Sequence, residues 1–340
     1  MSGNTTFRPV DTTVLSVTAV DAPVVMTSAD FDARLATSLE RTRMRPGLLS
    51  RLAGIRERRW WPEGTSFVDG AVEAGAKAVA EAGVDPARIG MLVNTSVSRD
   101  HLEPSVAVRI HHELGLASHC QNFDLTNACL GFLNGMQLAA TMIDAGQIDY
   151  ALVVDGEGSR EPQEHTLQRL ARPETTAEDL QREFATLTLG SGAAAMVLGR
   201  ASQHPEGHAV IGGASRAATE HHELCVGDFT RMRTDTAGLL RAGMAIAGDL
   251  WRDAAAEFDW SDMARYIVHQ VSSVHTERTA SSLGLPLDRI PLTFPTLGNV
   301  GPAAVPITLA KEAESLQAGD RVLLMGIGSG LNMTCLELRW

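Results

Sequence analysis

Features of several common protein classes are missing from this sequence. Its 340 residues contain 4 cysteines, with no CxxC pair and no cysteine–histidine cluster, which argues against a disulfide framework or a zinc site. No apolar run reaches the roughly 18 residues of a membrane-spanning helix, and no basic segment followed by an apolar one marks a signal peptide at the N-terminus. We therefore expect a soluble, cytoplasmic protein without a bound metal.

Aromatic residues and positive charge are also scarce. Aromatics make up 5% of the chain and hydrophobic residues 44%, a composition that suits closely packed layers of helices and sheets. The formal net charge is −12, and a nucleic-acid partner is not expected because phosphate binding needs a basic face. A dinucleotide cofactor is not expected either, because no GxGxxG motif follows an early strand with an acidic residue further on.

Patterns of buried strands alternate with helical patterns along the chain. Alternation of this kind predicts an α/β fold in which helices cover the sheets. The expected strands span 90–97, 150–155, 190–199, 209–213, 266–269, 321–325 and 332–340, and the clearest expected helices span 132–143 and about 237–256.

The two halves of the sequence look like two copies of one plan. Each contains a strand, a loop with a reactive residue, a helix, and a strand beside a glycine-rich turn, Gly190–Gly192 in the first half and Gly326–Gly330 in the second. A cluster of Ser, Gln, His, Pro and Gly places the boundary between residues 1–204 and residues 205–340. The polar segment at about 158–185 is predicted to be an inserted lobe over a site, and a solvated surface helix is the alternative.

Cys129 is the strongest candidate for a catalytic residue. It lies between a short strand-like stretch, 121–125, and the first turn of the predicted helix 132–143. Unpaired backbone N–H groups at a helix N-terminus favour a thiolate, and the small neighbours Ala128 and Gly131 let a substrate carbonyl approach the backbone. This arrangement is typical of a nucleophile for acyl transfer, although a buried structural thiol also fits the local sequence.

Further candidates lie in the second half of the chain. His269 ends a predicted strand, and Asn299 lies in a loop, 298–306, that contains two glycines and two prolines. A His N–H and an Asn N–H directed at one carbonyl oxygen would polarise it, as an enolate in carbon–carbon bond formation requires. The turn at Ser329 offers backbone N–H groups as a second anion hole. A lone histidine at a strand end also fits a packed core residue, so these assignments are hypotheses.

Together these motifs resemble the thiolase superfamily, and most closely its β-ketoacyl-ACP synthase III-like group. The resemblance rests on the ordered set of Cys129 in NACLGF, His269 in HQ and Asn299 in GNVGPA, and on the terminal GIGSG. The early segment Gly54–Arg59, GIRERR, is similar to the same group. The resemblance covers essentially the whole chain. It implies the thiolase fold, with five αβαβα layers built from two duplicated halves, and a homodimer.

Within this group the chain is similar to enzymes of olefin biosynthesis that join two fatty acyl-CoAs head to head. The likeness is carried by residues 94–105, 150–157 and 187–190. It implies that Glu103 reaches across the dimer into the partner's site. A malonyl donor forms its carbanion by losing CO2, whereas a plain acyl-CoA needs a base for its α-proton. Without the resemblance, Glu103 also fits an acidic residue at the start of a helix.

The resemblance thus implies an acyltransferase that catalyses a non-decarboxylative Claisen condensation, the first step of long-chain olefin or β-lactone synthesis. Cys129 would carry the first acyl group, with its backbone N–H and that of Ser329 as the oxyanion hole. Glu103 would remove the α-proton of the second acyl-CoA, while His269 and Asn299 would stabilise the enolate oxygen.

Coenzyme A thioesters are the expected substrates, and no cofactor or metal is expected. Weaker candidates for contacts with CoA phosphates are Arg51, Arg56, Arg58 and Arg59. Association with downstream enzymes of the same pathway is also expected. Two alternatives stay open: a decarboxylative β-ketoacyl-ACP synthase III or acyltransferase, and a non-catalytic subunit of a heterodimer.

Overall fold

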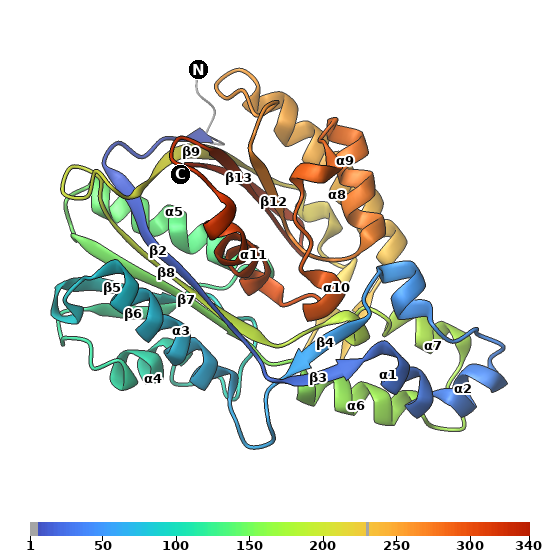
Figure 1. The fold of residues 1–340 in the computed structure, drawn as a ribbon. Coiled ribbons are helices and arrows are strands. Elements are labelled where there is room, and N and C mark those ends of the chain that lie inside the picture. The colour runs from blue at the N-terminus through green and yellow to red at the C-terminus, as the bar shows by residue number, and fades with distance from the viewer. Residues whose placement is uncertain (1–5, 229–230) are drawn as a thin grey trace.

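A mixed sheet of ten strands forms the centre of the molecule (Figure 1). The computed structural model describes residues 6–228 and 231–340. The sheet has two wings, and within the described ranges they join where β2 pairs with β9, with Thr13 opposite Ala209 and Val14 opposite His208. The first wing contains β2 (Thr12–Asp21), β5 (Ile89–Asn94), β6 (Gln121–Asp124), β7 (Tyr150–Glu157) and β8 (Gly192–Arg200). The second contains β1 (Thr6–Phe7), β9 (His208–Ala217), β12 (Arg265–Val268), β13 (Arg321–Gly328) and β14 (Asn332–Arg339).

The two wings repeat one topology. The strand order β5-β7-β8-β2 in the first wing matches β12-β13-β14-β9 in the second. In each series the first pair is parallel and the next two pairs are antiparallel. Along the chain, β8 is the last of the four matched strands of the first wing and β9 is the first of the four in the second, so we take the loop 201–207 as the division between the halves.

Helices fill the space between the wings and cover their outer faces. The inner pair is α5 (Gly131–Asp144) and α11 (Ala304–Glu312), and one core cluster joins side chains of both helices to strands of both wings. Outside the first wing lie α3 (Phe67–Ala82) and α4 (Val106–Glu113). Outside the second lie α8 (Thr236–Ala254) and α9 (Ser273–Leu283). These five layers confirm the predicted αβαβα fold.

The central helix α5 is apolar on more than one side because it packs between two sheets. Phe132, Leu133 and Met136 are all buried. Gly135 lets the helix approach the first wing closely, since a Cβ there would lie 3.0 Å from Val153 Cγ1. This packing fixes the N-terminal end of α5, and with it the turn that carries Cys129.

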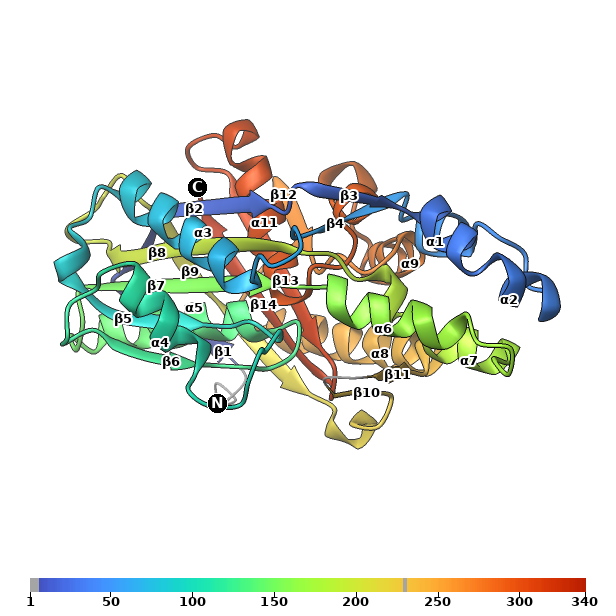
Figure 2. The same cartoon turned by 90° about the horizontal axis from the view of Figure 1, so that it is seen from below.

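A separate lobe extends from one end of the layers (Figure 2). The segment predicted as an insertion forms α6 (Arg160–Leu170) and α7 (Ala177–Arg182). Leu167 and Leu170 are buried in a small core with Phe31 and Trp60, so α6 is not simply a solvated surface helix. The lobe also includes residues near the N-terminus, in β3 (Val24–Thr27), α1 (Ser28–Arg34), α2 (Ala36–Arg41), a π-helix (Leu49–Ala53) and β4 (Glu57–Trp60).

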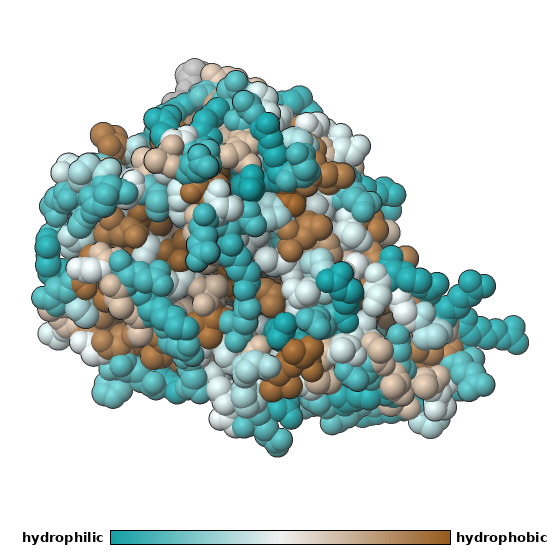
Figure 3. All heavy atoms as spheres, viewed as in Figure 1, coloured by the Kyte–Doolittle hydropathy of each residue, from teal (hydrophilic) through white to brown (hydrophobic). Residues whose placement is uncertain are grey.

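Short elements complete the chain. The hairpin of β10 (Cys225–Gly227) and β11 (Met232–Thr234) precedes α8, and α10 (Phe294–Leu297) precedes α11. Short 3-10 helices span Pro86–Arg88, Thr186–Thr188, Thr219–His221, Leu287–Arg289, Gly301–Ala303 and Ala313–Ser315. Polar side chains cover much of the face in Figure 3, with small scattered groups of hydrophobic ones. No helix in the described part of the chain is long and apolar enough to cross a membrane.

Candidate active site

One large cavity, of about 1510 Å³, brings together most of the predicted catalytic residues. Its wall includes Cys129, His269, Asn299 and Ser329, which lie far apart in the sequence. Each occupies the end of a core element: Cys129 precedes α5, His269 follows β12, Asn299 lies between α10 and α11, and Ser329 follows β13. The lobe helix α6 supplies another part of the wall, so the lobe covers the cavity.

The turn that carries Cys129 is packed tightly against the turn after β13. Ala128 adopts a left-handed conformation, with φ of 45°, which turns the chain sharply just before the cysteine. A side chain at Gly328 would come within 2.6 Å of the Asn127 carbonyl oxygen, so only glycine allows the two turns to approach so closely. The result is that Cys129 and Ser329 face one cavity from adjacent backbone segments.

The Cys129 thiol is not the ready thiolate that its place before a helix predicts. Burial is the largest influence and raises its pKa, and the nearby carboxyl of Glu157 raises it further, followed by Cys225 and Asp155. Desolvation and negative neighbours both disfavour a thiolate, and here they outweigh the helix N-terminus. The resting Cys129 side chain is therefore a neutral thiol.

His269 is held as a neutral imidazole. Its side chain is buried, and its backbone N–H donates to the Met325 carbonyl oxygen at 2.8 Å. Burial, with a smaller contribution from His275, lowers its pKa to about 4. Its Nδ1 has no hydrogen-bond partner among the described residues. A neutral imidazole donates one N–H without bringing a positive charge into the cavity.

Asn299 is fixed by its backbone on both sides. Its N–H donates to the Thr188 carbonyl oxygen at 2.8 Å, and its own carbonyl accepts from Gly190 N–H at 2.9 Å. The preceding Gly298 has φ of 71°, and a Cβ there would lie 2.8 Å from the Thr188 oxygen. The Asn299 side-chain oxygen accepts from Gly301 N–H at 3.0 Å. The side-chain N–H₂ is therefore the half of the amide that remains to donate into the cavity.

Sequence reasoning missed a buried pair of carboxyls beside Cys129. Asp155 and Glu157 belong to the end of β7 and are both buried. Burial raises the pKa of Glu157 to about 7. Burial, and then the charge of Glu157, raises the pKa of Asp155. The only sequence signal was the placing of two acids in an otherwise apolar strand, where unpaired charge is costly.

The raised pKa of Glu157 predicts a pH-dependent stability. An unfolded Glu releases its proton near pH 4.5, whereas the folded protein keeps this one up to about pH 7. Stability contributed by Glu157 is therefore lost as the pH rises through this window. We expect the free energy of unfolding of the wild type, relative to that of Glu157→Gln, to fall by about 1–3 kcal/mol between pH 5 and pH 8. Urea denaturation at several pH values measures this difference, and parallel curves would contradict it.

The structure corrects the prediction for Arg58. Its side chain is completely buried, and its guanidinium donates to Ser28 Oγ at 3.1 Å and to the Leu187 carbonyl oxygen at 3.0 Å. The same group lies over the Phe31 ring, 4.4 Å from its centre. Burial lowers the pKa of Arg58 to about 10. Arg58 holds parts of the lobe together and has no exposed group for a CoA phosphate.

The other predicted arginines lie outside the cavity wall. Arg59 is half-buried and donates to the Glu57 carboxylate at 3.1 Å. Arg51 and Arg56 are exposed on the segment before β4. The basic side chains that do line the cavity are Arg99, Arg160 and Arg231, which sequence reasoning did not select.

Glu103 lies apart from the cavity of its own subunit. It is exposed, in the connection between β5 and α4, and is not part of the cavity wall. The three residues around it, from His101 to Pro104, are exposed as well. The structure of one chain therefore does not bring Glu103 to Cys129. Within the described residues, no group of three or more His, Cys, Asp or Glu side chains is placed to hold a metal ion.

Comparison with known proteins identifies the family. The family of the 3-oxoacyl-[acyl-carrier-protein] synthase III C-terminal region matches residues 254–340, and the synthase III family matches 123–161. The acyl-CoA:acyl-CoA alkyltransferase of Xanthomonas campestris is 43% identical over 325 residues, which cover 94% of this chain and 96% of that protein. The chain belongs to the acyl-CoA:acyl-CoA alkyltransferase family. The resemblance seen in the sequence is thereby confirmed.

Other members of the family agree with this assignment. The Shewanella oneidensis alkyltransferase is 37% identical over 336 residues, covering 94% of this chain and 96% of that one. A crystal structure of Xanthomonas campestris OleA with bound lauric acid and lauroyl-CoA, in which one cysteine is replaced by serine, has a TM-score of 0.95. It is 41% identical, and the match covers 97% of this chain and 99% of that one. The thiolase fold of the alkyltransferase family is therefore also the fold of this chain.

Proposed function

We propose that the protein joins two fatty acyl-CoAs head to head by a non-decarboxylative Claisen condensation. The observation that carries the proposal is the meeting of Cys129, His269, Asn299 and Ser329 in the wall of one cavity. Membership of the acyl-CoA:acyl-CoA alkyltransferase family supports this substrate class. The product is a 2-alkyl-3-ketoacyl thioester, or the corresponding acid after hydrolysis.

In the first step, the Cys129 sulfur attacks the carbonyl of the first acyl-CoA. The backbone N–H groups of Cys129 and Ser329 bind the oxyanion that forms. The carbon–sulfur bond to CoA breaks, and CoA leaves as a thiol with the proton of the cysteine. Because the resting thiol is neutral, Cys129 gives up its proton only during the attack on the bound acyl thioester.

In the second step, the partner's Glu103 takes an α-proton from the second acyl-CoA. The enolate oxygen accepts hydrogen bonds from neutral His269 and from the Asn299 amide. The α-carbon attacks the acyl-cysteine, so a carbon–carbon bond forms and the bond to Cys129 sulfur breaks. The proton held by Glu103 returns to that sulfur, and the enzyme is ready for another cycle.

The size and lining of the cavity suit two acyl chains. Its volume of about 1510 Å³ exceeds the roughly 300–1,000 Å³ of pockets for ordinary small ligands. Apolar side chains of α8 and of the second wing supply part of the wall, including Leu239, Leu240, Met244, Ile327 and Met333. Long acyl chains would bury their surface against these residues.

Several further assignments belong to the same proposal. We expect a homodimer, because Glu103 is useful only in a partner's site, and we expect no cofactor beyond the CoA thioesters. Arg51 and Arg56 remain candidates for contacts with CoA phosphates because both are exposed. The product would enter long-chain olefin or β-lactone synthesis through enzymes that associate with this one in the cytoplasm.

Incubating the purified protein with a long-chain acyl-CoA alone tests the proposal. We expect an acyl adduct on the protein, release of free CoA, and a coupled product in the mass spectrum, all without a malonyl donor. Coupling only after addition of a malonyl thioester would favour a decarboxylative synthase III instead. Failure to form any adduct would favour a non-catalytic subunit.

A further inference from the structure

The segment that carries Glu103 is anchored at its first end by the two buried acids of β7. Glu157 accepts from Val97 N–H at 2.6 Å and from the Ser98 N–H at 3.1 Å and hydroxyl at 2.5 Å. Asp155 accepts from the Thr95 hydroxyl at 2.5 Å. The Gly156 N–H also donates to the Ser96 hydroxyl oxygen at 3.0 Å, so the chain that leaves β5 is fastened to β7 over four consecutive residues, 95–98.

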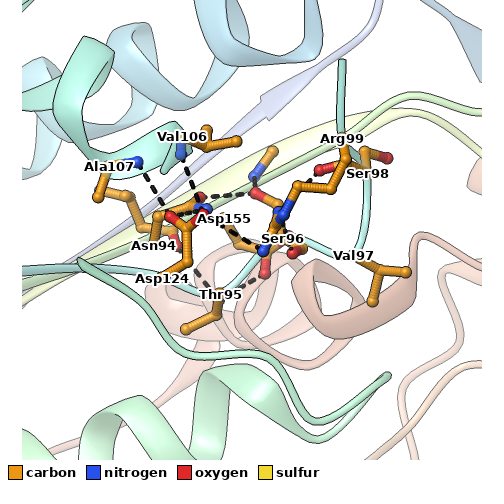
Figure 4. A network of polar contacts seen from close by, with 12 residues as sticks. Asn94, Thr95, Ser96, Val97, Ser98, Arg99, Val106, Ala107, Asp124 and Asp155 are labelled. Carbon is orange, nitrogen blue, oxygen red and sulfur yellow. Dashed lines mark hydrogen bonds and ion pairs between the residues drawn. The ribbon is translucent and has the colours of Figure 1, made fainter. Parts of the chain in front are cut away.

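A third carboxylate, Asp124 at the end of β6, anchors the other end of the segment (Figure 4). It accepts from the backbone N–H groups of Val106 and Ala107, both at 3.0 Å, in the first turn of α4. It also accepts from the Asn94 side chain at 3.0 Å. One side chain of the first wing thus binds the residues on both sides of the Glu103 segment.

Arg99 connects the two anchors. Its guanidinium donates to the carbonyl oxygens of Ser96 and Ser98 at 2.6 and 2.8 Å, and it lies 3.4 Å from the Asp124 carboxylate. The side chains of Arg99 and Asp124 are only 17% and 14% exposed, so water screens this ion pair less than a surface pair. We call Asp124, Arg99 and Glu157 the clamp, and the residues 100–105 between its ends the arm.

The arm itself projects from the molecule. Glu103 is exposed, and Leu102 beside it is 80% exposed. Both side chains are therefore open to contact by a second subunit. The chain just before the arm differs, because Val97, Ser98 and Arg99 line the cavity of their own subunit, as does Asp100, the first residue of the arm.

We propose that Asp124 and Arg99 are positioning residues that hold the arm so that Glu103 reaches the α-proton in the partner's site. This rests on the proposed function, in which Glu103 is the base. A catalytic group displaced by about 1 Å can cost on the order of 10²-fold in rate, and a free six-residue arm would move much further. The clamp replaces that freedom with one fixed position.

A mixed dimer with a single productive site provides the test. One subunit carries Cys129→Ala and keeps its arm, and the other carries Glu103→Gln and keeps its nucleophile. Two different affinity tags allow the mixed dimer to be purified. Only the site that combines Cys129 of the second subunit with Glu103 of the first can condense palmitoyl-CoA.

Asp124→Asn is then placed in one subunit or the other. Asp124 is outside the cavity wall, and asparagine keeps an oxygen that can cap α4 while removing the charge that holds Arg99. We expect condensation to fall at least about tenfold when the substitution is in the Cys129→Ala subunit. In the Glu103→Gln subunit the arm is idle and Asp124 reaches the working cavity only through Arg99, so we expect a loss at least about fivefold smaller than in the other position. Asp85→Asn, which alters another capping carboxylate, is the matched control in both positions.

The outcomes separate the clamp from the rest of the proposal. An equal loss in both positions would show a general structural role for Asp124, and no loss in either would show that the arm needs no clamp; each result overturns the inference. If the wild type forms product but the parent mixed dimer does not, Glu103 does not act in the partner's site. That result would also overturn the role of the clamp. Failure of the wild type would overturn the proposed function itself.

Discussion

Cys129→Ala is expected to abolish acyl transfer and condensation together. Loss of a nucleophile that forms a covalent intermediate removes the whole pathway, so the rate of product formation should fall by at least about 10⁴-fold. Acylation is measured by the mass of the intact protein after incubation with palmitoyl-CoA, and condensation by the coupled product. The fold should persist, because Cys129 is only partly buried, at the cavity surface.

Cys225→Ala is the matched control for this result. Cys225 is the other free cysteine in the cavity wall, and it lies on the β10 strand rather than at the start of α5. It does not directly precede a helix, and its sulfur lies 3.4 Å from the Thr234 hydroxyl oxygen. We expect this variant to form the acyl adduct normally. An adduct that persists in Cys129→Ala and disappears in Cys225→Ala would reverse the assignment of the nucleophile.

Glu103→Gln is expected to separate the two steps of the reaction. Cys129 should still be acylated within about twofold of the wild-type rate, because Glu103 takes no part in the attack on the first acyl-CoA. Condensation should fall by about 10²–10⁴-fold, the usual contribution of a general base. A rapid-mixing measurement of free CoA reports acylation, and the coupled product reports condensation.

Exchange with solvent gives an independent measure of the same base. In heavy water, the wild type should exchange the α-hydrogen of a second, poorly condensing acyl-CoA for deuterium, and Glu103→Gln should not. Glu103→Asp keeps the carboxylate but shortens its reach by one methylene, so intermediate activity is expected. Equal loss of acylation and condensation in Glu103→Gln would instead show that the residue maintains the fold or the dimer.

Much of the core was predictable because its signals are local. The buried strands and the helix after Cys129 have apolar patterns that hold within stretches of 5–15 residues, and these patterns depend on nearest neighbours in the chain. The predicted bounds of the helix are close to the observed ones: α5 spans Gly131–Asp144, and the prediction was 132–143. The candidate catalytic residues were also visible because each lies at the end of such an element.

The lobe was only partly predictable. The polar segment 158–185 indicated α6 and α7, but nothing in it shows that β3, β4, α1 and α2 pack beside it. That association depends on contacts such as Phe31 with Trp60, 5.9 Å between ring centres, and both with the leucines of α6. The α6 leucines lie more than 100 positions beyond Phe31 and Trp60, and contacts over such separations leave no periodic signal in one sequence.

The sequence by itself determined the alternation of strands and helices, the duplicated plan and the chemical identity of the cavity residues Cys129, His269 and Asn299. Only the tertiary structure decided their protonation, because the pKa of a thiol or an imidazole depends on burial and on neighbouring charge. It likewise decided that Arg58 is buried and hydrogen-bonded inside the lobe. It also decided that Asp124, Arg99 and Glu157 hold the chain on both sides of the arm. Such properties depend on which distant segments meet and on how much water remains between them.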